Sequence, residues 1–220
     1  MADEIIYKDL FHKTVSLDEA MNDRDGYFKC YCRAGKLKRI DACNYDGRIY
    51  EYTYYSDKNE NFEEILATAE SICDSATIYF NEQTESKYSI WDRWIYLKND
   101  IVEKAKAVFD ERNREIAEQI LDINSLEVKK TTKKHYLNRL GPFIDDDTVI
   151  NFGTLEFYYD YPYLSDKKIE VRINLPGYDH KPYYITPDKN VLLEKNRILN
   201  VFSWYDNPYY HSREPLVPDL

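Results

Sequence analysis

The sequence predicts an α+β fold in which an antiparallel β-meander packs with two or three amphipathic helices and is followed by a Tyr-rich, β-containing C-terminal part. Three observations support this prediction: alternating Tyr- and Ile-rich runs between residues 27 and 56, apolar stripes at helical spacing after residue 59, and clustered tyrosines after residue 150. With 43% hydrophobic and 15% aromatic residues, the chain has enough apolar surface to offset the entropy lost on folding.

Alternating segments define the predicted meander. They are YFKCYCRA (27–34), KLKRIDACNY (36–45) and RIYEYTYYS (48–56), and turns containing Gly35 and Gly47 separate them. In the third segment, Tyr50, Tyr52 and Tyr54 share one side of the strand. ATIYFNE (76–82) and KYSIWDRWIYL (87–97) predict two more strands, joined through residues 83–86, with Trp91 and Trp94 on opposite faces.

Three segments indicate helices. Residues 16–21 begin with Ser16 and Glu19 at the spacing of a capping box. A second helix follows Asn59 or Asn61 as cap, and its apolar stripe is Phe62, Ile65, Leu66, Ala69 and Ile72. The third is expected over residues 99–122, where the apolar stripe is Ile101, Ala105, Val108, Phe109, Ile116, Ile120 and Leu121.

A change of composition marks the expected domain boundary. Residues 124–142 are basic, and Gly141-Pro142 at the end of this stretch interrupts the chain. We therefore expect an α+β domain over residues 1–140 and a Tyr-rich, β-containing region over residues 141–220, either as a second domain or as part of the same core. Pro208, Pro215 and Pro218 predict an irregular arm that lies on the surface at the end of the chain.

The charge of the chain limits its partners. A net charge of -10 and a pI of about 5.0 argue against direct binding to nucleic acid, where Lys and Arg must displace counterions, and favour a protein partner with a basic surface.

No stretch approaches the roughly 20 apolar residues that a bilayer crossing requires, so we expect no membrane contact. The N-terminal residues do not resemble a signal peptide, which predicts a cytoplasmic protein.

Sequence motifs for catalysis and for cofactors are absent. The histidines are scattered, and neither a nucleophile elbow nor a phosphate-binding glycine loop occurs. Cys30 and Cys32 lack the usual spacing of zinc ligands, so we expect reduced thiols and no metal site. The sequence therefore favours a protein without cofactor that is not an enzyme, and an active site without a recognisable motif is the alternative.

Tyrosine-rich stretches are the most unusual feature of the chain. Three segments each combine aromatic residues, an acidic residue, proline and further aromatic residues, at 158–163, 178–184 and 204–210. One interpretation is that these tyrosines fill strand ends and pack internally. The other is that they form a partner-binding face, because tyrosine buries a large area at little entropic cost. The residues predicted to bind the partner are Tyr158, Tyr159, Asp160, Tyr161, Tyr163, Tyr183, Tyr184, Trp204, Tyr205, Asp206, Tyr209 and Tyr210.

Two short strand repeats carry a resemblance to a family. Residues 32–37 (CRAGKL) and 44–52 (NYDGRIYEY) resemble the strand repeats of immunity proteins from bacterial polymorphic-toxin and contact-dependent inhibition systems. The resemblance implies a protein that neutralises a toxin by covering a basic active-site surface, often that of a nuclease. It implies no individual functional residue.

Two alternatives to an immunity protein stay open. One is an inhibitor of a host defence nuclease, encoded by a phage or mobile element, whose carboxylates mimic DNA. The other is an enzyme or ligand-binding domain with a pocket lined by Tyr and Trp. The sequence does not indicate the partner's identity or the oligomeric state.

Overall fold

The computed structural model describes residues 4–10, 12–98, 100–138, 152–160, 168–174, 182–186, 202 and 204–218. The strands are β1 (Glu4–Lys8), β2 (Thr14–Val15), β3 (Tyr27–Arg33), β4 (Lys36–Cys43), β5 (Ile49–Tyr55), β6 (Ser75–Glu85), β7 (Tyr88–Leu97), β8 (Asp100–Phe109), β9 (Glu115–Leu121), β10 (Val128–Asn138), β11 (Phe152–Tyr159), β12 (Ile169–Asn174) and β13 (Tyr183–Ile185). The helices are α1 (Leu17–Asn22) and α2 (Phe62–Ile72), and a 3-10 turn, η2, covers Pro208–Tyr210.

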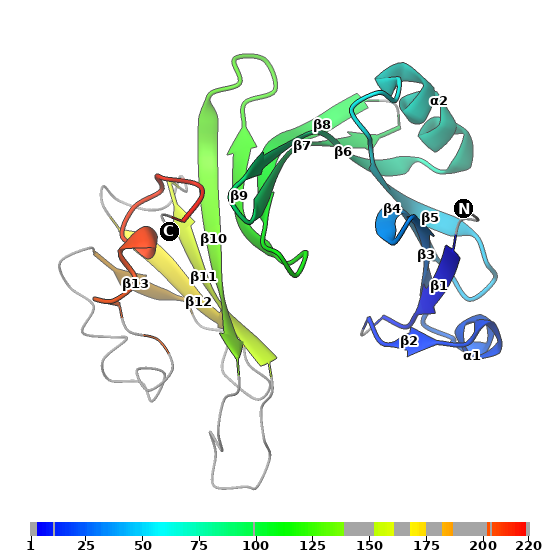
Figure 1. The fold of residues 1–220 in the computed structure, drawn as a ribbon, viewed down its shortest axis with the longest axis horizontal. Coiled ribbons are helices and arrows are strands. Elements are labelled where there is room, and N and C mark those ends of the chain that lie inside the picture. Colours follow the sequence, from blue (N-terminus) through cyan, green and yellow to red (C-terminus); the bar gives the residue numbers. More distant parts are fainter. Residues whose placement is uncertain are drawn as a thin grey trace, which may run out of the picture. The chain divides into compact units, whose positions relative to one another are not determined.

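All of these strands belong to one mixed sheet, in the order β13-β12-β11-β10-β9-β8-β7-β6-β5-β4-β3-β1-β2 (Figure 1). Of the described residues, 56% lie in strands and 12% in helices. The prediction of an α+β fold, with a meander packed against two or three amphipathic helices, is therefore wrong. The meander itself is present, but it continues into a much larger sheet.

The chain divides into two compact units. Unit 1 comprises Met1–Gln83 and Trp91–Ala105, and unit 2 comprises Thr84–Ile90 and Lys106–Leu220. The boundary predicted after residue 140 lies outside the described residues. None of the helices in the described ranges has the length and apolar character that a bilayer crossing requires.

In unit 1, the predicted strands of the meander are confirmed as β3, β4 and β5, which pair antiparallel. The next pair is different, because β5 and β6 run parallel, with Tyr52 opposite Ala76 and Tyr54 opposite Ile78. A parallel pair needs a crossover connection, and α2 supplies it. Asn61 caps α2 by accepting a hydrogen bond from the Glu63 amide, as expected.

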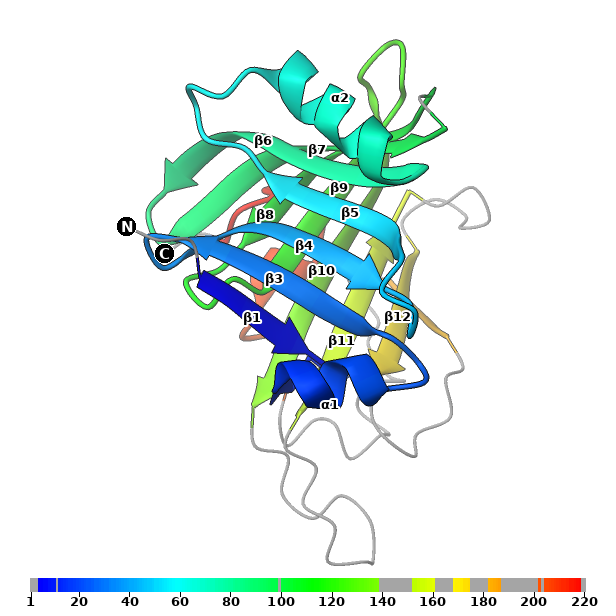
Figure 2. The ribbon, with the colours of Figure 1, turned by 90° about the vertical axis from the view of Figure 1, so that its right-hand side faces the viewer.

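Both helices of unit 1 lie on the same face of its sheet (Figure 2). The shorter helix, α1, has the predicted capping box of Ser16 and Glu19, and its Ala20 packs with Tyr27 and Cys43. The longer helix packs Ile65 and Ala69 onto strand residues. Those buried strand residues are Tyr52, Ala76, Ile78 and Tyr96.

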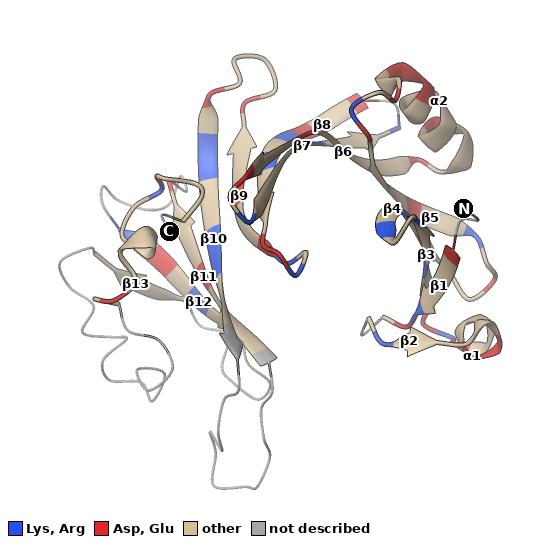
Figure 3. Ribbon diagram, in the orientation of Figure 1, with Lys and Arg blue, Asp and Glu red and all other residues tan. Residues whose placement is uncertain are grey.

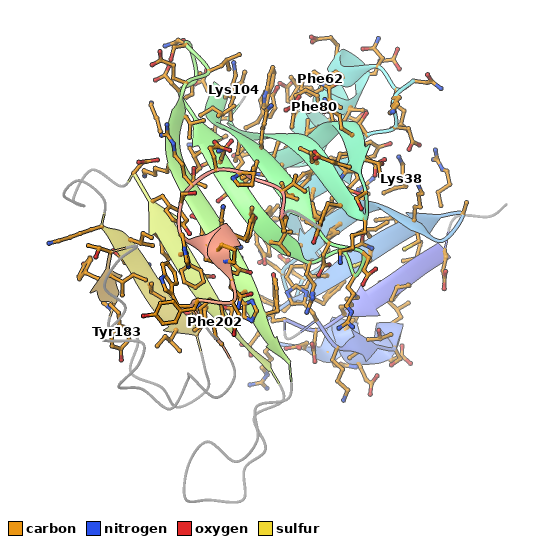
Figure 4. All side chains as sticks on the ribbon, turned by 60° about the vertical axis from the view of Figure 1, so that its left-hand side comes forward. Lys38, Phe62, Phe80, Lys104, Tyr183 and Phe202 are labelled. Carbon is orange, nitrogen blue, oxygen red and sulfur yellow. The ribbon has the colours of Figure 1, made fainter. Side chains whose placement is uncertain are left out.

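Aromatic rings fill the space beneath α2. Phe62 of the helix lies 4.9 Å from Phe80 and 5.3 Å from Trp94, measured between ring centroids (Figure 4). Trp91 instead contacts Tyr55 and Tyr79, 5.9 and 6.4 Å away. The two tryptophans of β7 therefore lie on opposite faces, which confirms the prediction.

The helix predicted over residues 99–122 is wrong, because this segment forms the hairpin of β8 and β9. The turn at Asp110 explains the difference. Its carboxylate accepts hydrogen bonds from the backbone amides of Arg112 and Arg114 and from the Arg114 side chain, all at 2.8–2.9 Å. Asn113, at φ 57°, completes the reversal in the left-handed conformation that Asn tolerates.

In unit 2, strands β9 to β13 pair antiparallel and one face carries the core. Residue 202 and residues 204–218, which we call the C-terminal arm, pack on that face; Figure 4 marks Phe202 and Tyr183. The buried members of this core are Leu155, Phe157, Tyr159, Ile169, Val171, Ile173, Ile185, Phe202, Trp204 and Tyr210. The arm is irregular, as predicted, but it belongs to the core.

Candidate functional site

A pocket of about 820 Å³ lies between α2 and strands β3 to β5 of unit 1. This volume falls in the range of small-molecule sites. Figure 2 shows the helix and these strands together. The residues that line the pocket are Tyr31, Cys32, Arg33, Lys38, Arg39, Tyr52, Tyr54, Asn59, Glu60, Asn61, Glu64, Ile65 and Thr68.

A β-bulge brings two consecutive cations into this pocket. Tyr31 of β3 is opposite Arg39 of β4, but Cys32 is opposite Leu37, so Lys38 is the extra residue of β4. Consecutive residues of a regular strand point to opposite faces. The bulge interrupts that alternation, and both Lys38 and Arg39 line the pocket.

Arg39 is held in place by a buried carboxylate and two phenol rings. Its Nε and Nη2 donate to the two carboxylate oxygens of Asp41, at 2.6 and 2.8 Å. Asp41 is fully buried, whereas the Arg39 side chain is 24% exposed. The guanidinium carbon lies 4.7 Å from the ring centroid of Tyr31 and 4.9 Å from that of Tyr52. The guanidinium is therefore fixed at the pocket wall.

Asp57 and Glu60 pair with the second cation, Lys38. Lys38 Nζ lies 2.7 Å from Asp57 and 3.6 Å from Glu60 (Figure 4 marks Lys38). Glu60 also accepts hydrogen bonds from the hydroxyl of Tyr54 at 3.0 Å and the backbone amide of Asp57 at 2.8 Å, and lies 3.8 Å from Arg33. The charge of Lys38 is thus compensated within the protein.

The chemistry of the pocket suits binding better than acid–base catalysis. Burial raises the pKa of Tyr52 to about 12, and burial together with the hydrogen bond to Glu60 raises the pKa of Tyr54 to about 12. Burial also raises the pKa of the Cys32 thiol. These groups are protonated near pH 7, so they are poor nucleophiles and poor general bases. The lining residues that the structure describes include no histidine.

The Tyr-rich residues of β11 divide between surface and core. Tyr158 donates a hydrogen bond to Glu156, and the Arg172 guanidinium lies 4.6 Å from its ring centroid. Tyr159 is buried and donates to the backbone carbonyl of Tyr210 at 2.7 Å. Asp160 is exposed and pairs with Arg213. Tyr161 and Tyr163 lie outside the described residues.

The predicted residues of the arm divide in the same way. Trp204 and Tyr210 are buried in the core of unit 2, and Tyr209 packs against them. Tyr205 is 74% exposed, and Asp206 beside it is exposed as well. On β13, Tyr183 packs against the core while Tyr184 is 46% exposed. Internal packing therefore accounts for Trp204, Tyr209 and Tyr210, while partner binding stays a prediction for the exposed Tyr184 and Tyr205.

A buried lysine fastens the arm to the sheet. Lys133 of β10 is fully buried and donates from Nζ to the carbonyl oxygens of Tyr209 and Ser212, at 2.7 and 2.9 Å. Its Nζ also lies 3.8 Å from the ring centroid of Tyr209. Tyrosines that the sequence presented as surface candidates thus complete an internal hydrogen-bonded layer.

Sequence reasoning missed the pocket. Its residues come from five separate segments, and the alternation of β4 places Lys38 on the wrong face unless the bulge is known. The sequence does contain a partial signal, because Tyr52 and Tyr54 share one side of a strand and the strand before it, β4, has three basic residues.

Comparisons with family models, with curated proteins and with solved structures found no match to the chain.

Proposed function

We propose that this protein binds another protein with a basic surface and blocks its activity, as an immunity protein blocks a toxin. The observation that carries the proposal is the exposed surface made by the turn between β4 and β5 and the first residues of β5. Tyr45 is 68% exposed and Tyr50 44%, and their neighbours Asp46 and Glu51 are exposed too. We call these four residues the hairpin surface. Phenols supply contact area at low entropic cost, and carboxylates steer a basic partner.

Hydrogen bonds hold the hairpin surface in a defined shape. The amide of Gly47 donates to the carbonyl of Asn44, and the amide of Arg48 donates to the Asp46 carboxylate, at 2.9 and 3.1 Å. Gly47 has φ +78°, a conformation that glycine adopts without steric cost. A preorganised loop loses less entropy when it binds than a loose one.

The helices of unit 1 add to the negative potential. Neither α1 nor α2 contains Lys or Arg, and both carry acidic residues in their first turns, as Figure 3 shows. With a net charge of -10 for the chain, a basic partner would be attracted over a distance limited by the Debye length. The proposal requires no cofactor and no metal, and it places the protein in the cytoplasm.

The alternatives differ in what they would bind. An inhibitor of a host defence nuclease, encoded by a phage or mobile element, would use the same acidic surface against a different basic protein. The hairpin surface combines phenols with carboxylates, which favours docking of a protein over mimicry of DNA. The pocket of unit 1 favours the ligand-binding alternative.

Affinity capture tests the proposal. The wild-type protein is immobilised and exposed to lysate of cells that carry the gene, and any stoichiometric basic protein is purified and assayed with and without the inhibitor. We expect capture, loss of the partner's activity, and slower association at higher salt. Replacing Tyr45 and Tyr50 by Ala should weaken the complex by about 2 kcal/mol or more for each residue that is a hot spot.

Met21→Ala provides the matched control. Met21 is 59% exposed on α1, so its truncation removes a similarly exposed large side chain that lies outside the hairpin surface. The control should bind as the wild type does. The proposal fails if no stoichiometric basic protein is captured, if the captured protein keeps its activity, or if the tyrosine variant binds as tightly as the control.

A further inference from the structure

We propose that the pocket of unit 1 binds a small organic molecule carrying a carboxylate or phosphate group, which the open edge of Arg39 recognises. This inference goes beyond the proposed function, because it concerns a different surface and a different class of ligand. It depends on three features of the pocket: the geometry of Arg39, the local charge balance and the size of the cavity.

Arg39 has hydrogen-bonding capacity left after it binds Asp41. A guanidinium has five N–H donors, and Asp41 takes those of Nε and one of Nη2. Among the described residues, no acceptor bonds to Nη1. Nη1 and the second hydrogen of Nη2 form a fork that matches two oxygens of a carboxylate or phosphate.

This fork is preorganised. The two rings that contact the guanidinium come from the strands on either side of β4, since Tyr31 belongs to β3 and Tyr52 to β5. Asp41 binds the edge of the guanidinium that Nε and Nη2 form and so holds its orientation. A ligand oxyanion would therefore meet donors that need no reorganisation, which favours binding.

The charges at the pocket oppose an anion near α2 but not one near Arg39, because the pairing with Asp41 balances the guanidinium and leaves its Nη1 edge open to an oxyanion. Glu60 is already bonded to Tyr54 and lies near Lys38 and Arg33, so its charge is largely compensated. Glu64 is the other carboxylate of the lining, and it is exposed on α2. It should repel an anionic ligand, so its neutralisation should tighten binding. Neutralising Glu64 should instead weaken the binding of a cationic ligand.

The cavity has room for more than an inorganic ion. Its volume of about 820 Å³ exceeds what phosphate occupies, and the walls include Ile65, Thr68 and the Tyr54 ring. Such walls can contact an apolar or aromatic body. The ligand class is therefore an organic carboxylate or phosphate.

Titration calorimetry with the purified protein tests the proposal. The probes are benzoate, phenyl phosphate and inorganic phosphate, with uncharged benzamide and cationic benzamidine as controls. We expect benzoate or phenyl phosphate to bind more tightly than all the other probes, and the better of the two identifies the oxyanion.

Arg39→Lys keeps the charge but removes the fork, and should weaken binding about tenfold or more. Arg48→Lys, an exposed arginine outside the lining, should change nothing.

Two further variants keep the test decisive if Arg39→Lys does not fold. Thr68 lines the pocket from the exposed side of α2, so Thr68→Trp should block binding without touching the Arg39–Asp41 pair. Glu64→Gln should strengthen anion binding. The proposal is overturned if neither benzoate nor phenyl phosphate binds, or if Thr68→Trp binds them as the wild type does. It is also overturned if inorganic phosphate or benzamide binds as tightly as these two probes. A third contrary result is that benzamidine binds most tightly and Glu64→Gln weakens its binding. These results do not depend on the capture of a protein partner.

Discussion

At the scale of single residues, Asp41 and Lys133 are charged groups that are fully buried, one in each unit. Each is compensated by groups within 3 Å: Asp41 by Arg39, and Lys133 by two backbone carbonyls of the arm. An uncompensated buried charge would be strongly destabilising. These two residues therefore fix which segments must lie against them.

Replacing Asp41 by Asn should destabilise the fold. The substitution keeps the shape of the side chain but removes the charge that balances Arg39, and breaking a buried pair costs about 3 kcal/mol or more. The guanidinium is partly exposed, so we expect a value at the low end, read from the midpoint of urea unfolding. Asp160→Asn is the control, because the Asp160–Arg213 pair is exposed and should contribute less than about 1 kcal/mol. Equal losses in the two variants would contradict the argument.

Local residue patterns could be predicted from the sequence. The capping box at Ser16 and the cap at Asn61 depend on residues within three positions of each other, so the sequence alone contains them. The bulge at Lys38 depends on how β3 and β4 align, which only the folded sheet determines. For this reason the starts of α1 and α2 were predicted and the pocket was not.

At the scale of elements, the hairpin turns contain residues in the left-handed conformation. Such residues occur at Ala34, Ser86, Lys98, Asn113 and Leu126. For a residue with a side chain this conformation costs about 1 kcal/mol or more relative to glycine. The turns are therefore formed against local preference and are stabilised by the strands that they join.

Leu126→Gly should stabilise the protein by up to about 1 kcal/mol. Leu126 has φ 60° and is 55% exposed, so glycine relieves the backbone strain and little apolar contact is lost. Leu97→Gly is the matched control, since Leu97 is similarly exposed but ends strand β7, where glycine costs about 0.5–1 kcal/mol. The midpoints of thermal and urea unfolding should rise for Leu126→Gly and fall for Leu97→Gly. A shift of both variants in the same direction would refute the explanation.

The segment at residues 99–122 shows why spacing alone misled. Ile101, Ala105 and Val108 have helical spacing, but Ala107 and Val108 are both fully buried, as in a strand covered on both faces. The side chain of Asp110 forms the reversal that a long helix would not contain. The acidic and basic residues on either side of that turn have the spacing of the exposed face of a helix, so the pattern predicted one.

At the scale of the whole molecule, buried tyrosines are spread over both units. Burial raises the pKa of Tyr52, Tyr54 and Tyr96 to about 12 in unit 1. In unit 2, burial raises the pKa of Tyr159, Tyr209 and Tyr210. Their ordinary pKa is near 10, so the unfolded chain loses these protons at lower pH than the folded one.

The stability of the protein should therefore be unaffected by these groups below about pH 10 and should fall as the pH rises from 10 toward 12. For Tyr52, which is almost fully buried, the loss is about 2 kcal/mol at the upper end. Urea unfolding at pH 9 and pH 11.5 measures it. Tyr52→Phe should show a smaller difference between these two pH values than the wild type, and an equal difference would contradict the burial argument.

The sheet as a whole was only partly predictable. The meander and both strands after α2 follow from alternation between neighbouring residues. The continuation into a single mixed sheet depends on pairings such as β10 with β11, in which His135 is opposite Leu155, and no local pattern encodes them. The tyrosines showed the same limit, because composition cannot separate Trp204 in the core from Tyr205 on the surface.

The position of the C-terminal arm has a consequence for the order in which the protein is made. Residue 202 and residues 204–218 supply two hydrogen-bond acceptors to Lys133 and add Phe202, Trp204 and Tyr210 to the core that includes β11 and β12. During translation, unit 1 has all its residues once position 105 has left the ribosome. Unit 2, in contrast, lacks part of its core until the arm residues up to Tyr210 have emerged, and until then the nascent chain exposes an incomplete apolar layer to chaperones.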